Sequence, residues 1–585
     1  MTFLFILIYD IREKLLQMNK LKNTVRFFAA TLMIFVLSGC GDMFDLDINQ
    51  DPNNPTQASS DLLLAQSQYS LMSIIGGGVN DDLMGFMGII GSGDNWNLGQ
   101  TSYNGTWRSL YADVLKDLEG IIKANSGDTG SPQYLGIAQL LKAYVVSTMV
   151  DLFGDIPYTE ALNGDSEKPI VNPNFEDDAA IYTKMLTLVD EGIKGVTNAR
   201  RPVAVTGDLI YAGNTARWEK FGLSLKLKLL MNTRLVNTNA KSQIEAVIAT
   251  GKLISSTAED FTFQYSKTVT PDNRHPWYRA SYTAGTNGFT YILHQFMLES
   301  LEDADPRWPY YFRRIQGTVL DQADPSQRNT SPCSQTPSCT YGYFPISNLV
   351  IKRLYENKNL KYDDKAKTFL AGLFGRDRAD PAGVPLDGDF RLIPGVYPAG
   401  GYFDITAPAI PAANRAPGGG IFPALTSVNV LYHQIEAILS LGVAGDAKAL
   451  FKKAIEDHIG KVVTFGRATD VNAVAPPITM VDGRVLDTKA YVDLWMSRYD
   501  NAANNNAKLN VVGKQLWFTS WGNGYELYNF YRRTGFPNTL QDPILAPRKF
   551  PVRLPYPQEE LTLNPNAKTA KDVVYDRDRI FWDPN

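Results

Sequence analysis

The sequence predicts a mainly α-helical protein, in which paired helices form a scaffold and a large irregular, loop-rich region packs on it. Two stretches, 59–250 and 425–540, carry apolar residues at the three- and four-residue steps of a helix face. Between them, residues 251–424 are rich in Gly, Pro and aromatics without a sustained period. Disordered segments are poor in aromatics, so we expect this region to be ordered. We interpret residues 59–585 as a single domain.

Three helices are predicted in the first stretch. Around Trp107 the apolar positions step by four and three, which places Trp107 and Tyr111 on one buried face. A second helix ends near Gly154 and Pro157, because both residues favour a helix end. A third helix aligns Trp218 with later leucines on its buried side. Each of these helices is expected to bury one face against a neighbour.

The second stretch contains the clearest helix pair. Gly442 is expected to end one helix, Asp446 to cap the next, and Gly460 to end that helix in turn. So short a link requires an antiparallel pair. The pattern resembles a tetratricopeptide repeat, in which small residues let two helices approach closely: Ala437, Leu441, Gly442, Ala447, Leu450, Phe451, Ala454 and Ile455. Such pairs must stack to bury their apolar faces, so the earlier helices are expected to belong to the stack.

Residues 1–39 are predicted to be a signal peptide. The apolar run Phe27–Leu37 is too short for the roughly 20 residues of a membrane span, but it fits the h-region of a removable signal. Three basic residues precede it, as an n-region requires: Lys20, Lys22 and Arg26. Met18 is therefore interpreted as the true start, and residues 1–17 as a start-site artefact.

Cys40 ends the step Leu37-Ser38-Gly39-Cys40, which resembles a bacterial lipobox. A cysteine at this place receives a lipid, which anchors the chain to the membrane without spanning it. The alternative is an ordinary cleaved signal with Cys40 merely nearby. Residues 40–58 are acidic and rich in Asn and Pro, and are expected to form a flexible tether. Acidic residues such as Asp42 so soon after the cysteine indicate an outer-membrane protein that faces the cell exterior.

Charge and cysteine content narrow the possible partners. The net charge of −4 and pI near 5.8 give no basic footprint, which disfavours nucleic-acid binding. With Cys40 lipidated, only Cys333 and Cys339 remain, inside a Pro/Ser-rich loop. In an oxidising exterior this pair is expected to close a small disulfide loop. The alternative is two free thiols.

The segment Asn95-Trp96-Asn97 is the first candidate for a ligand contact. Flat aromatic faces together with planar polar side chains suit a ligand that offers both C–H surface and hydroxyls. Trp96 lies between two asparagines in a glycine-rich loop, where a core tryptophan is not expected, and Tyr103 follows closely. A ligand platform is weighed equally here against simple loop packing.

Arg274, Trp277 and Tyr278 form the second candidate, within PDNRHPWYRASY. Aromatic rings beside arginines again fit a ligand of this kind, but a structural role after Pro276 is slightly favoured. Trp308 is interpreted as structural.

No residue pattern predicts catalysis, a cofactor or a metal. The four histidines lack metal-ligand spacing, and neither a G-x-S-x-G elbow nor a Walker loop is present. Glu526 with Arg532 or Arg533 is expected to form an ion pair that fixes a helix end. The protein is accordingly predicted not to be an enzyme.

Several segments in a fixed order resemble the SusD/RagB family of lipid-anchored nutrient-binding proteins, and within it the SusD-like subgroup. They extend over nearly the whole chain: Asp151–Leu162, Asp305–Arg307, Phe374–Asp377, Gly395–Gly401, Glu436–Ala437, Gly524–Pro537 and Arg553–Pro557. The resemblance implies four tetratricopeptide-like helix pairs, ligand-binding loops, and a TonB-dependent barrel of the SusC type as partner. The cysteine-bearing insertion TSPCSQTPSC departs from the family pattern.

The function implied is capture of an oligosaccharide or polysaccharide nutrient and its delivery to the barrel. A peptide ligand is the first alternative, because family members differ in cargo. A lipid-anchored glycoside hydrolase is the second, since the paired carboxylates that such enzymes use need no fixed spacing in sequence.

Overall fold

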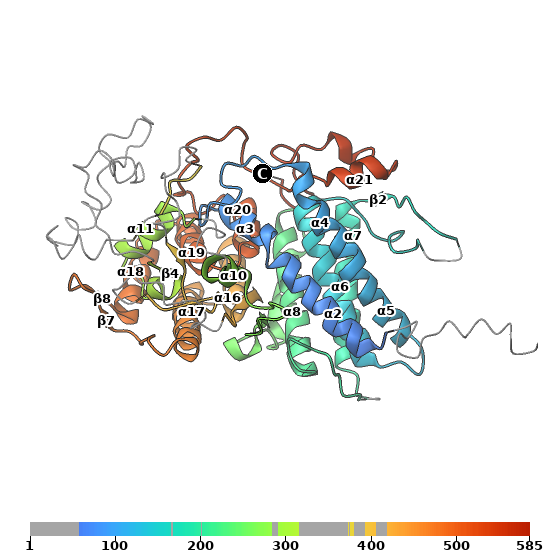
Figure 1. Cartoon of the computed structure of the whole chain (residues 1–585), viewed down its shortest axis with the longest axis horizontal. Helices are drawn as coiled ribbons and strands as arrows, with labels where there is room; N and C mark the ends of the chain where they lie inside the picture. The colour runs from blue at the N-terminus through green and yellow to red at the C-terminus, as the bar shows by residue number, and fades with distance from the viewer. Residues whose placement is uncertain are drawn as a thin grey trace, which may run out of the picture. The chain divides into compact units, whose positions relative to one another are not determined.

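The computed structural model describes residues 58–164, 168–199, 202–283, 291–314, 373, 375–379, 392–404 and 418–584. The predictions for the signal peptide, for Cys40 and for the Cys333–Cys339 pair lie outside these residues. Internal contacts divide the chain after Ser59, and the fold described below is that of Ser60 onward. It is mainly α-helical, as predicted (Figure 1).

The chain begins this unit with helices that pack on one side of the scaffold. The predicted helix around Trp107 is present, with a π-helical turn, η3, in its middle. Its buried face holds Trp107 and Val114, as expected, while Tyr111 is half-buried. The elements are α2 (Ser60–Ile75), α3 (Gly78–Phe86), η2 (Gln100–Tyr103), α4 (Asn104–Ser109), η3 (Leu110–Leu115) and α5 (Lys116–Asn125).

Four helix pairs form the scaffold within the described residues. They are α6 (Pro132–Phe153) with α7 (Asp178–Val196), α8 (Thr215–Asn232) with α9 (Ala240–Ala249), α16 (Ser427–Leu441) with α17 (Ala447–Thr469), and α18 (Thr488–Asp500) with α19 (Asn505–Thr519). Each pair contacts the next, and α8 packs against α16, so the two predicted stretches form one stack. The helix α20 (Tyr525–Thr534) follows, and the 3-10 turn η4 (Thr233–Leu235) extends α8.

Glycines allow α6 and α7 to approach each other closely. A Cβ on Gly136 of α6 would lie 2.6 Å from the carbonyl oxygen of Gly192 in α7, so neither helix could come this near with a larger residue. Ser131 caps α6 by accepting a hydrogen bond from Tyr134 N. Among the described helices, α6 is long and apolar enough to cross a membrane, but most of it is buried in the core.

The α16–α17 link follows the prediction, but the end of α17 does not. Gly442 has φ +67°, and Asp446 Oδ1 accepts a hydrogen bond from Ala449 N at 3.0 Å. The expectation that Gly460 ends the second helix is wrong, because α17 continues to Thr469. An exposed glycine costs a helix only about 1 kcal/mol relative to alanine, and the buried Val462 and Gly466 beyond it hold the helix on the core.

The described parts of the middle region are short elements that pack on this scaffold. Two antiparallel strand pairs tie them together, β3 with β6 and β4 with β5; in the first, Gln264 pairs with Ile421. Trp308 is 1% exposed, which agrees with its structural assignment. The elements are η5 (Thr257–Glu259), β3 (Phe261–Gln264), α10 (Pro276–Tyr282), α11 (His294–Glu302), α12 (Trp308–Tyr311), β4 (Phe312–Arg313), β5 (Ile393–Pro394) and β6 (Ile421–Leu425).

Small elements complete the unit. The strand pairs β1 (Ile156–Pro157) with β2 (Phe175–Glu176) and β7 (Ile478–Thr479) with β8 (Val485–Leu486) are antiparallel. A short helix α21 (Gln558–Leu563) and a 3-10 turn η7 (Ala570–Asp572) lie near the C-terminus, and α21 packs against α4 (Figure 1).

Buried charges connect the helices of the scaffold. Asp151 accepts four side-chain hydrogen bonds of 2.8–3.0 Å, from Tyr182, Asn232, Asn529 and Trp582. These partners come from three different helices and the C-terminal segment, so one carboxylate of the family-like segment Asp151–Leu162 links distant parts of the chain.

The prediction that Glu526 pairs with a following arginine is wrong, because both residues have other partners. Glu526 pairs with Lys228 of α8 at 2.5 Å and lies 2.9 Å from His433 Nε2. Arg533 instead pairs with Glu436 of α16 at 2.8 Å. Residues six or seven apart on a helix are separated by about 9–10 Å along its axis, farther than the three- and four-residue neighbours that meet, so both side chains pair with neighbouring helices instead.

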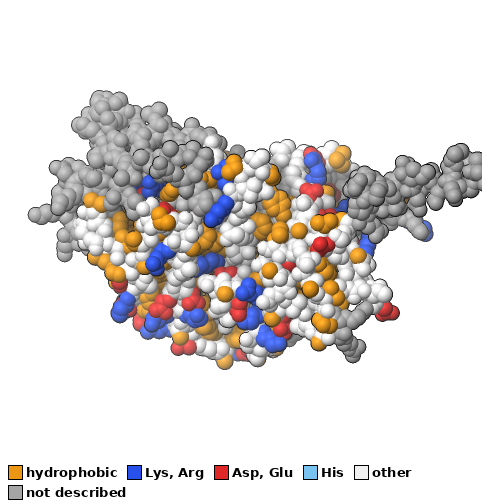
Figure 2. Space-filling view, turned by 60° about the horizontal axis from the view of Figure 1, so that its bottom comes forward, with side chains coloured by type: hydrophobic (Ala, Val, Ile, Leu, Met, Phe, Trp, Pro, Cys, Tyr) orange, Lys and Arg blue, Asp and Glu red, His pale blue; other side chains and the backbone are white. Residues whose placement is uncertain are grey.

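The outer surface carries charges of both signs. On the face shown in Figure 2, Lys and Arg side chains are interspersed with Asp and Glu. Several form exposed pairs along the helices, such as Lys453–Asp457 at 2.7 Å on α17 and Lys448–Asp500 at 2.8 Å between α17 and α18.

Candidate ligand-binding site

Trp96 adopts an unusual backbone conformation in the loop between α3 and η2. Its φ is +60°, in the left-handed region that a bulky side chain rarely occupies. Such strained residues cluster at functional sites, because the surrounding structure must hold them in place. The Trp96 loop is therefore a site whose geometry is imposed by its neighbours.

Three neighbours far along the chain hold Trp96. The Arg378 guanidinium lies 4.9 Å from the ring, and Phe550 packs against the ring edge-on at 5.7 Å. The Tyr575 hydroxyl donates to the Trp96 carbonyl at 2.9 Å and accepts from Leu98 N at 3.1 Å. The indole is consequently half-buried and fixed in orientation.

Asn95 and Asn97 precede and follow Trp96 in the sequence, and both are exposed. Asn95 Oδ1 accepts a hydrogen bond from Asn97 N at 3.1 Å, which closes a tight turn around Trp96. The turn therefore carries a fixed indole and two exposed amide side chains at consecutive positions, a combination of groups that suits a ligand with both C–H surface and hydroxyls.

Asp94 and Arg378 form the base of the loop. Asp94 Oδ2 accepts a hydrogen bond from Ala379 N at 2.7 Å, and burial raises the pKa of Asp94 to about 6. Burial also lowers the pKa of Arg378 to about 10, and Arg378 donates to the Gln541 carbonyl at 2.9 Å. These contacts tie the loop to segments more than 280 residues away.

Tyr103 lies in the core, with 2% of its surface exposed. Its hydroxyl donates to Asp82 Oδ2 at 2.9 Å, and Ser92 donates to the other carboxylate oxygen at 2.7 Å. Tyr103 thus supports the loop from below and presents no free ring face to solvent.

The residues of the second candidate are buried as well. Arg274 pairs with Asp272 at 2.6 Å and lies over the Tyr278 ring at 5.2 Å. Trp277 donates from Nε1 to Asp81 at 2.9 Å and packs against Trp521 at 5.0 Å. This burial agrees with the structural alternative, and a ligand role for these three residues stays a prediction.

The helix α3 connects the two candidate groups. Asp81 accepts from Trp277 of the second group, and the adjacent Asp82 accepts from Tyr103 of the first. Burial raises the pKa of Asp81 to about 7, and it raises that of Asp82 as well. Sequence reasoning missed these two carboxylates, and it also missed Arg378, Phe550 and Tyr575, because no local pattern marks contacts between residues so far apart in the chain. The one available signal was the charged doublet Asp81-Asp82 in an otherwise apolar helix.

One carboxylate cluster of the described residues has metal-like spacing. Ligand atoms of Asp155, Asp177 and Asp178 lie within 4.8 Å of one another. Each carboxylate already accepts a backbone N–H: Asp155 from Asp178 at 3.0 Å, Asp177 from Ala180 at 2.8 Å, and Asp178 from Phe581 at 3.0 Å. Capping of α7 and fixing of the C-terminal segment account for this cluster.

Taken together, the fold and the Trp96 loop define a class of protein: a scaffold of tetratricopeptide-like helix pairs that carries irregular, aromatic-bearing loops. Two family models match the chain. Residues 52–330 match the SusD-like model described as starch-binding and associating with the outer membrane. Residues 423–583 match the model of SusD and RagB outer-membrane lipoproteins. The chain belongs to the SusD/RagB family, as the sequence segments indicated.

Solved structures show the same fold. A chitin-binding protein aligns with TM-score 0.60 at 20% identity, covering 90% of this chain and all of its own. A SusD homologue from Bacteroides fragilis aligns with TM-score 0.62 at 19% identity, covering 90% and 99%. A chitin-binding SusD homologue from Flavobacterium johnsoniae aligns with TM-score 0.58 at 17% identity, covering 90% and 97%. Among curated proteins, none matches the chain.

Proposed function

We propose that the protein is a surface lipoprotein that binds an oligosaccharide or polysaccharide nutrient at the Trp96 loop. The observation that carries this proposal is the left-handed backbone of Trp96, whose ring is fixed by its neighbours and whose sequence neighbours Asn95 and Asn97 are both exposed. A sugar ring offers C–H surface to the indole and hydroxyls to Asn95 and Asn97. Membership of a family that includes starch-binding proteins, and likeness to two chitin-binding structures, support the same ligand class.

The bound glycan is then delivered to a TonB-dependent barrel of the SusC type, which serves as the membrane partner. Lipid on Cys40 anchors the protein to the outer membrane. The acidic residues that follow Cys40 direct the protein to the outer face of that membrane. Replacement of Cys40 by Ala should release the protein from the membrane fraction; unchanged retention would refute lipid anchoring. Co-purification of a barrel from detergent-solubilised membranes tests the partner.

The proposed role is non-catalytic. A glycoside hydrolase needs two carboxyl groups about 5–10 Å apart across the scissile bond. At the Trp96 loop, Asp94 is engaged by Ala379 N, and Asp82 by Tyr103 and Ser92. Release of reducing ends from a polysaccharide by the purified protein, lost when one carboxylate is replaced, would contradict this role.

The direct test compares Trp96 variants by calorimetry against a panel of polysaccharides, chito-oligosaccharides and peptides. Trp96→Ala should lower glycan affinity about tenfold, because a well-placed aromatic contact contributes about 1 kcal/mol or more. Trp96→Phe keeps a flat ring and should retain most of the affinity. Equal affinity in wild type and Trp96→Ala would remove Trp96 from the site, and melting temperatures check that both variants are folded.

A further inference from the structure

A cationic pair, Arg548 and Lys549, borders the Trp96 loop. Both side chains are exposed, and Phe550, the next residue, packs edge-on against the Trp96 ring with ring centres 5.7 Å apart. Consecutive Cα atoms are about 3.8 Å apart, so both cationic side chains branch from the chain within about 8 Å of the Phe550 Cα atom. The segment that fixes the indole thus also brings two positive charges to its side.

Tyr575 connects Arg548 to the loop a second time. The Arg548 guanidinium lies 6.0 Å from the centre of the Tyr575 ring, at the outer limit of a cation–π contact. The hydroxyl of the same tyrosine donates to the Trp96 carbonyl at 2.9 Å and accepts from Leu98 N at 3.1 Å. Two separate contacts therefore hold the cationic pair at the Trp96 loop.

Neither member of the cationic pair has an ion-pair partner among the described residues. Arg577, close by in the C-terminal segment, differs because it pairs with Asp578 at 2.7 Å. Asp576 faces the cationic pair, but its Oδ2 accepts a hydrogen bond from the backbone N of Lys549 at 3.2 Å and not from a side chain. The two cationic side chains are therefore open to an anionic group of a ligand.

Two other acids near the loop act on other groups. Asp94 Oδ2 accepts a hydrogen bond from Ala379 N at 2.7 Å. Asp542 is exposed and acts on the buried guanidinium of Arg378. Neither carboxylate forms an ion pair with the cationic pair, so both positive charges stay available at the edge of the loop.

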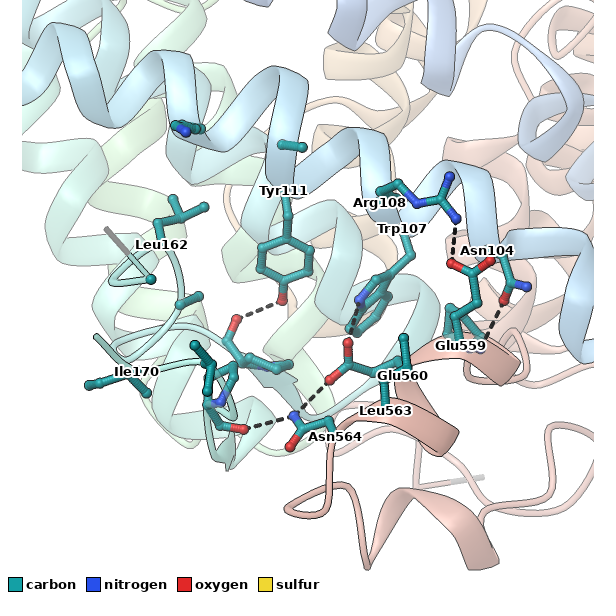
Figure 3. Close-up of a pocket in the computed structure, with 18 residues that line it drawn as sticks. Asn104, Trp107, Arg108, Tyr111, Leu162, Ile170, Glu559, Glu560, Leu563 and Asn564 are labelled. Carbon is teal, nitrogen blue, oxygen red and sulfur yellow. Dashed lines mark hydrogen bonds and ion pairs between the residues drawn. The ribbon is translucent and has the colours of Figure 1, made fainter. Parts of the chain in front are cut away.

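A cavity of about 570 Å³ between α4, the segment after β1 and α21 is the alternative place for an anionic ligand (Figure 3). Its cations are Arg108 and Lys116, and its carboxylates are Glu559 and Glu560. Arg108 pairs with Glu559, so a ligand anion would have to displace that carboxylate. Lys116 has no ion-pair partner among the described residues. An anionic ligand thus finds one open cation in this cavity and two at the Trp96 loop.

Resting on the glycan site proposed at Trp96, we propose that the ligand is an acidic polysaccharide, with carboxylate or sulfate groups on its sugar units. One unit lies against the Trp96 loop, and its hydroxyls bond to Asn95 and Asn97. An acid group of that unit or of its neighbour pairs with the cationic pair, where a guanidinium can hold a carboxylate or sulfate by two parallel N–H···O bonds. Exposed ion pairs are individually weak, so a chain that repeats its charges suits the site better than a single anion.

Calorimetry with three acidic polysaccharides tests the proposal: alginate, oligogalacturonate and chondroitin sulfate. Each is compared with a neutral form made by carboxyl reduction, with desulfation as well for chondroitin sulfate. Wild type should bind at least one acidic form about tenfold more tightly than its neutral form. Salt at about 1 M, which screens charges over about 3 Å, should remove that difference. Desulfated chondroitin keeps its carboxylates and separates the two kinds of acid group.

Arg548→Gln/Lys549→Gln should lower affinity for the acidic form about five- to tenfold, the effect of two exposed ion pairs, and leave the neutral form unchanged. The matched control is Lys116→Gln/Lys123→Gln, which removes the same charge from α5. Both lysines are exposed and lack an ion-pair partner among the described residues, and Lys116 lines the alternative cavity, so this variant should bind like wild type. Trp96→Ala should weaken both forms alike, and melting temperatures check that all variants are folded.

Four outcomes would overturn the proposal. Acidic and neutral forms that bind equally, with binding lost in Trp96→Ala, would exclude the acidic ligand and leave the glycan site standing. Acidic binding that falls in the α5 variant, and not in the variant of the cationic pair, would place the ligand in the cavity of Figure 3. Acidic binding that depends on the cationic pair but not on Trp96 would refute the glycan site itself. The fourth is the absence of saturable binding of any acidic form below ~1 mM.

Discussion

Glu436 is the residue whose replacement should destabilise the scaffold most clearly. Its carboxylate is fully buried in α16 and joins two other segments. Arg234 of η4 donates to it at 2.7 Å, and Arg533 of α20 donates two hydrogen bonds at 2.8 and 3.1 Å. Glu436→Gln removes the charge but keeps the shape, and it leaves two buried guanidinium groups without their counter-ion.

The expected loss of stability can be worked out from the titration of the Glu436 carboxyl group. Burial alone would raise its pKa, but Arg533 and Arg234 outweigh burial and hold the pKa at about 2, against an ordinary value of 4.5. At about 1.36 kcal/mol for each tenfold change in acidity, the charged form gains about 3 kcal/mol in the folded protein. Breaking a buried ion pair by removing one partner costs about 3–5 kcal/mol, which agrees. We therefore expect Glu436→Gln to lose about 3 kcal/mol at pH 7.

The assay is urea unfolding followed by tryptophan fluorescence and circular dichroism, at pH 6 and pH 3. A depressed pKa stabilises the fold above pH 4.5, and this stability is lost as the pH falls toward about 2. The difference between wild type and variant should therefore shrink by about 2 kcal/mol between pH 6 and pH 3. Glu456→Gln, at an exposed pair with Lys452, should cost less than about 0.5 kcal/mol. An equal midpoint for Glu436→Gln and wild type, or a pH-independent difference, would refute the reasoning.

Three further predictions concern single positions. On α17, Gly460→Ala should stabilise the folded protein by about 0.5–1 kcal/mol, because the position is helical and open. Gly466→Ala should destabilise it by about 1–3 kcal/mol, because the new Cβ would lie 2.4 Å from the Tyr310 ring. Thermal melts of both variants check this pair, and shifts of equal sign would contradict it. Asp446→Ala removes the cap of α17 and should cost about 1 kcal/mol in urea unfolding; an unchanged midpoint would exclude the cap. Burial raises the pKa of Asp81 to about 7 in the folded protein, so the stability that its protonated form contributes is lost as the pH rises through 7. Asp81→Asn removes this charge and should therefore raise the melting temperature more at pH 8 than at pH 5. A larger gain in melting temperature at pH 5 than at pH 8 would contradict the raised pKa of Asp81.

Sequence periodicity identified the scaffold because its helices bury one face each. The cap at Asp446 and the turn at Gly442 were both located from residue type alone, since only a few residues meet those backbone requirements. Gly460 misled the prediction because a helix end depends on what lies beyond it. Val462 and Gly466 pack on the core and carry α17 past the glycine.

The candidate site was only partly predictable. Trp96 was singled out by its polar, glycine-rich context, but its left-handed backbone and its contacts with Arg378 and Phe550 depend on segments hundreds of residues away. Tyr103 and Trp277 matched the residue types of a glycan site, yet both are buried. Local sequence does not distinguish an aromatic ring that faces solvent from one that supports the loop beneath.

The β3–β6 pair brings the two ends of the middle region side by side. The chain departs from the helical stack at Phe261–Gln264 and returns beside that point at Ile421–Leu425. The entropic cost of closing a loop grows only with the logarithm of its length, so residues can be added between these strands at little cost to the stack. The segments of this excursion that return to the stack are fixed, because Arg307 donates to Tyr491 and Trp277 packs against Trp521, so added length belongs between these anchors while α8 and α16 keep their contact.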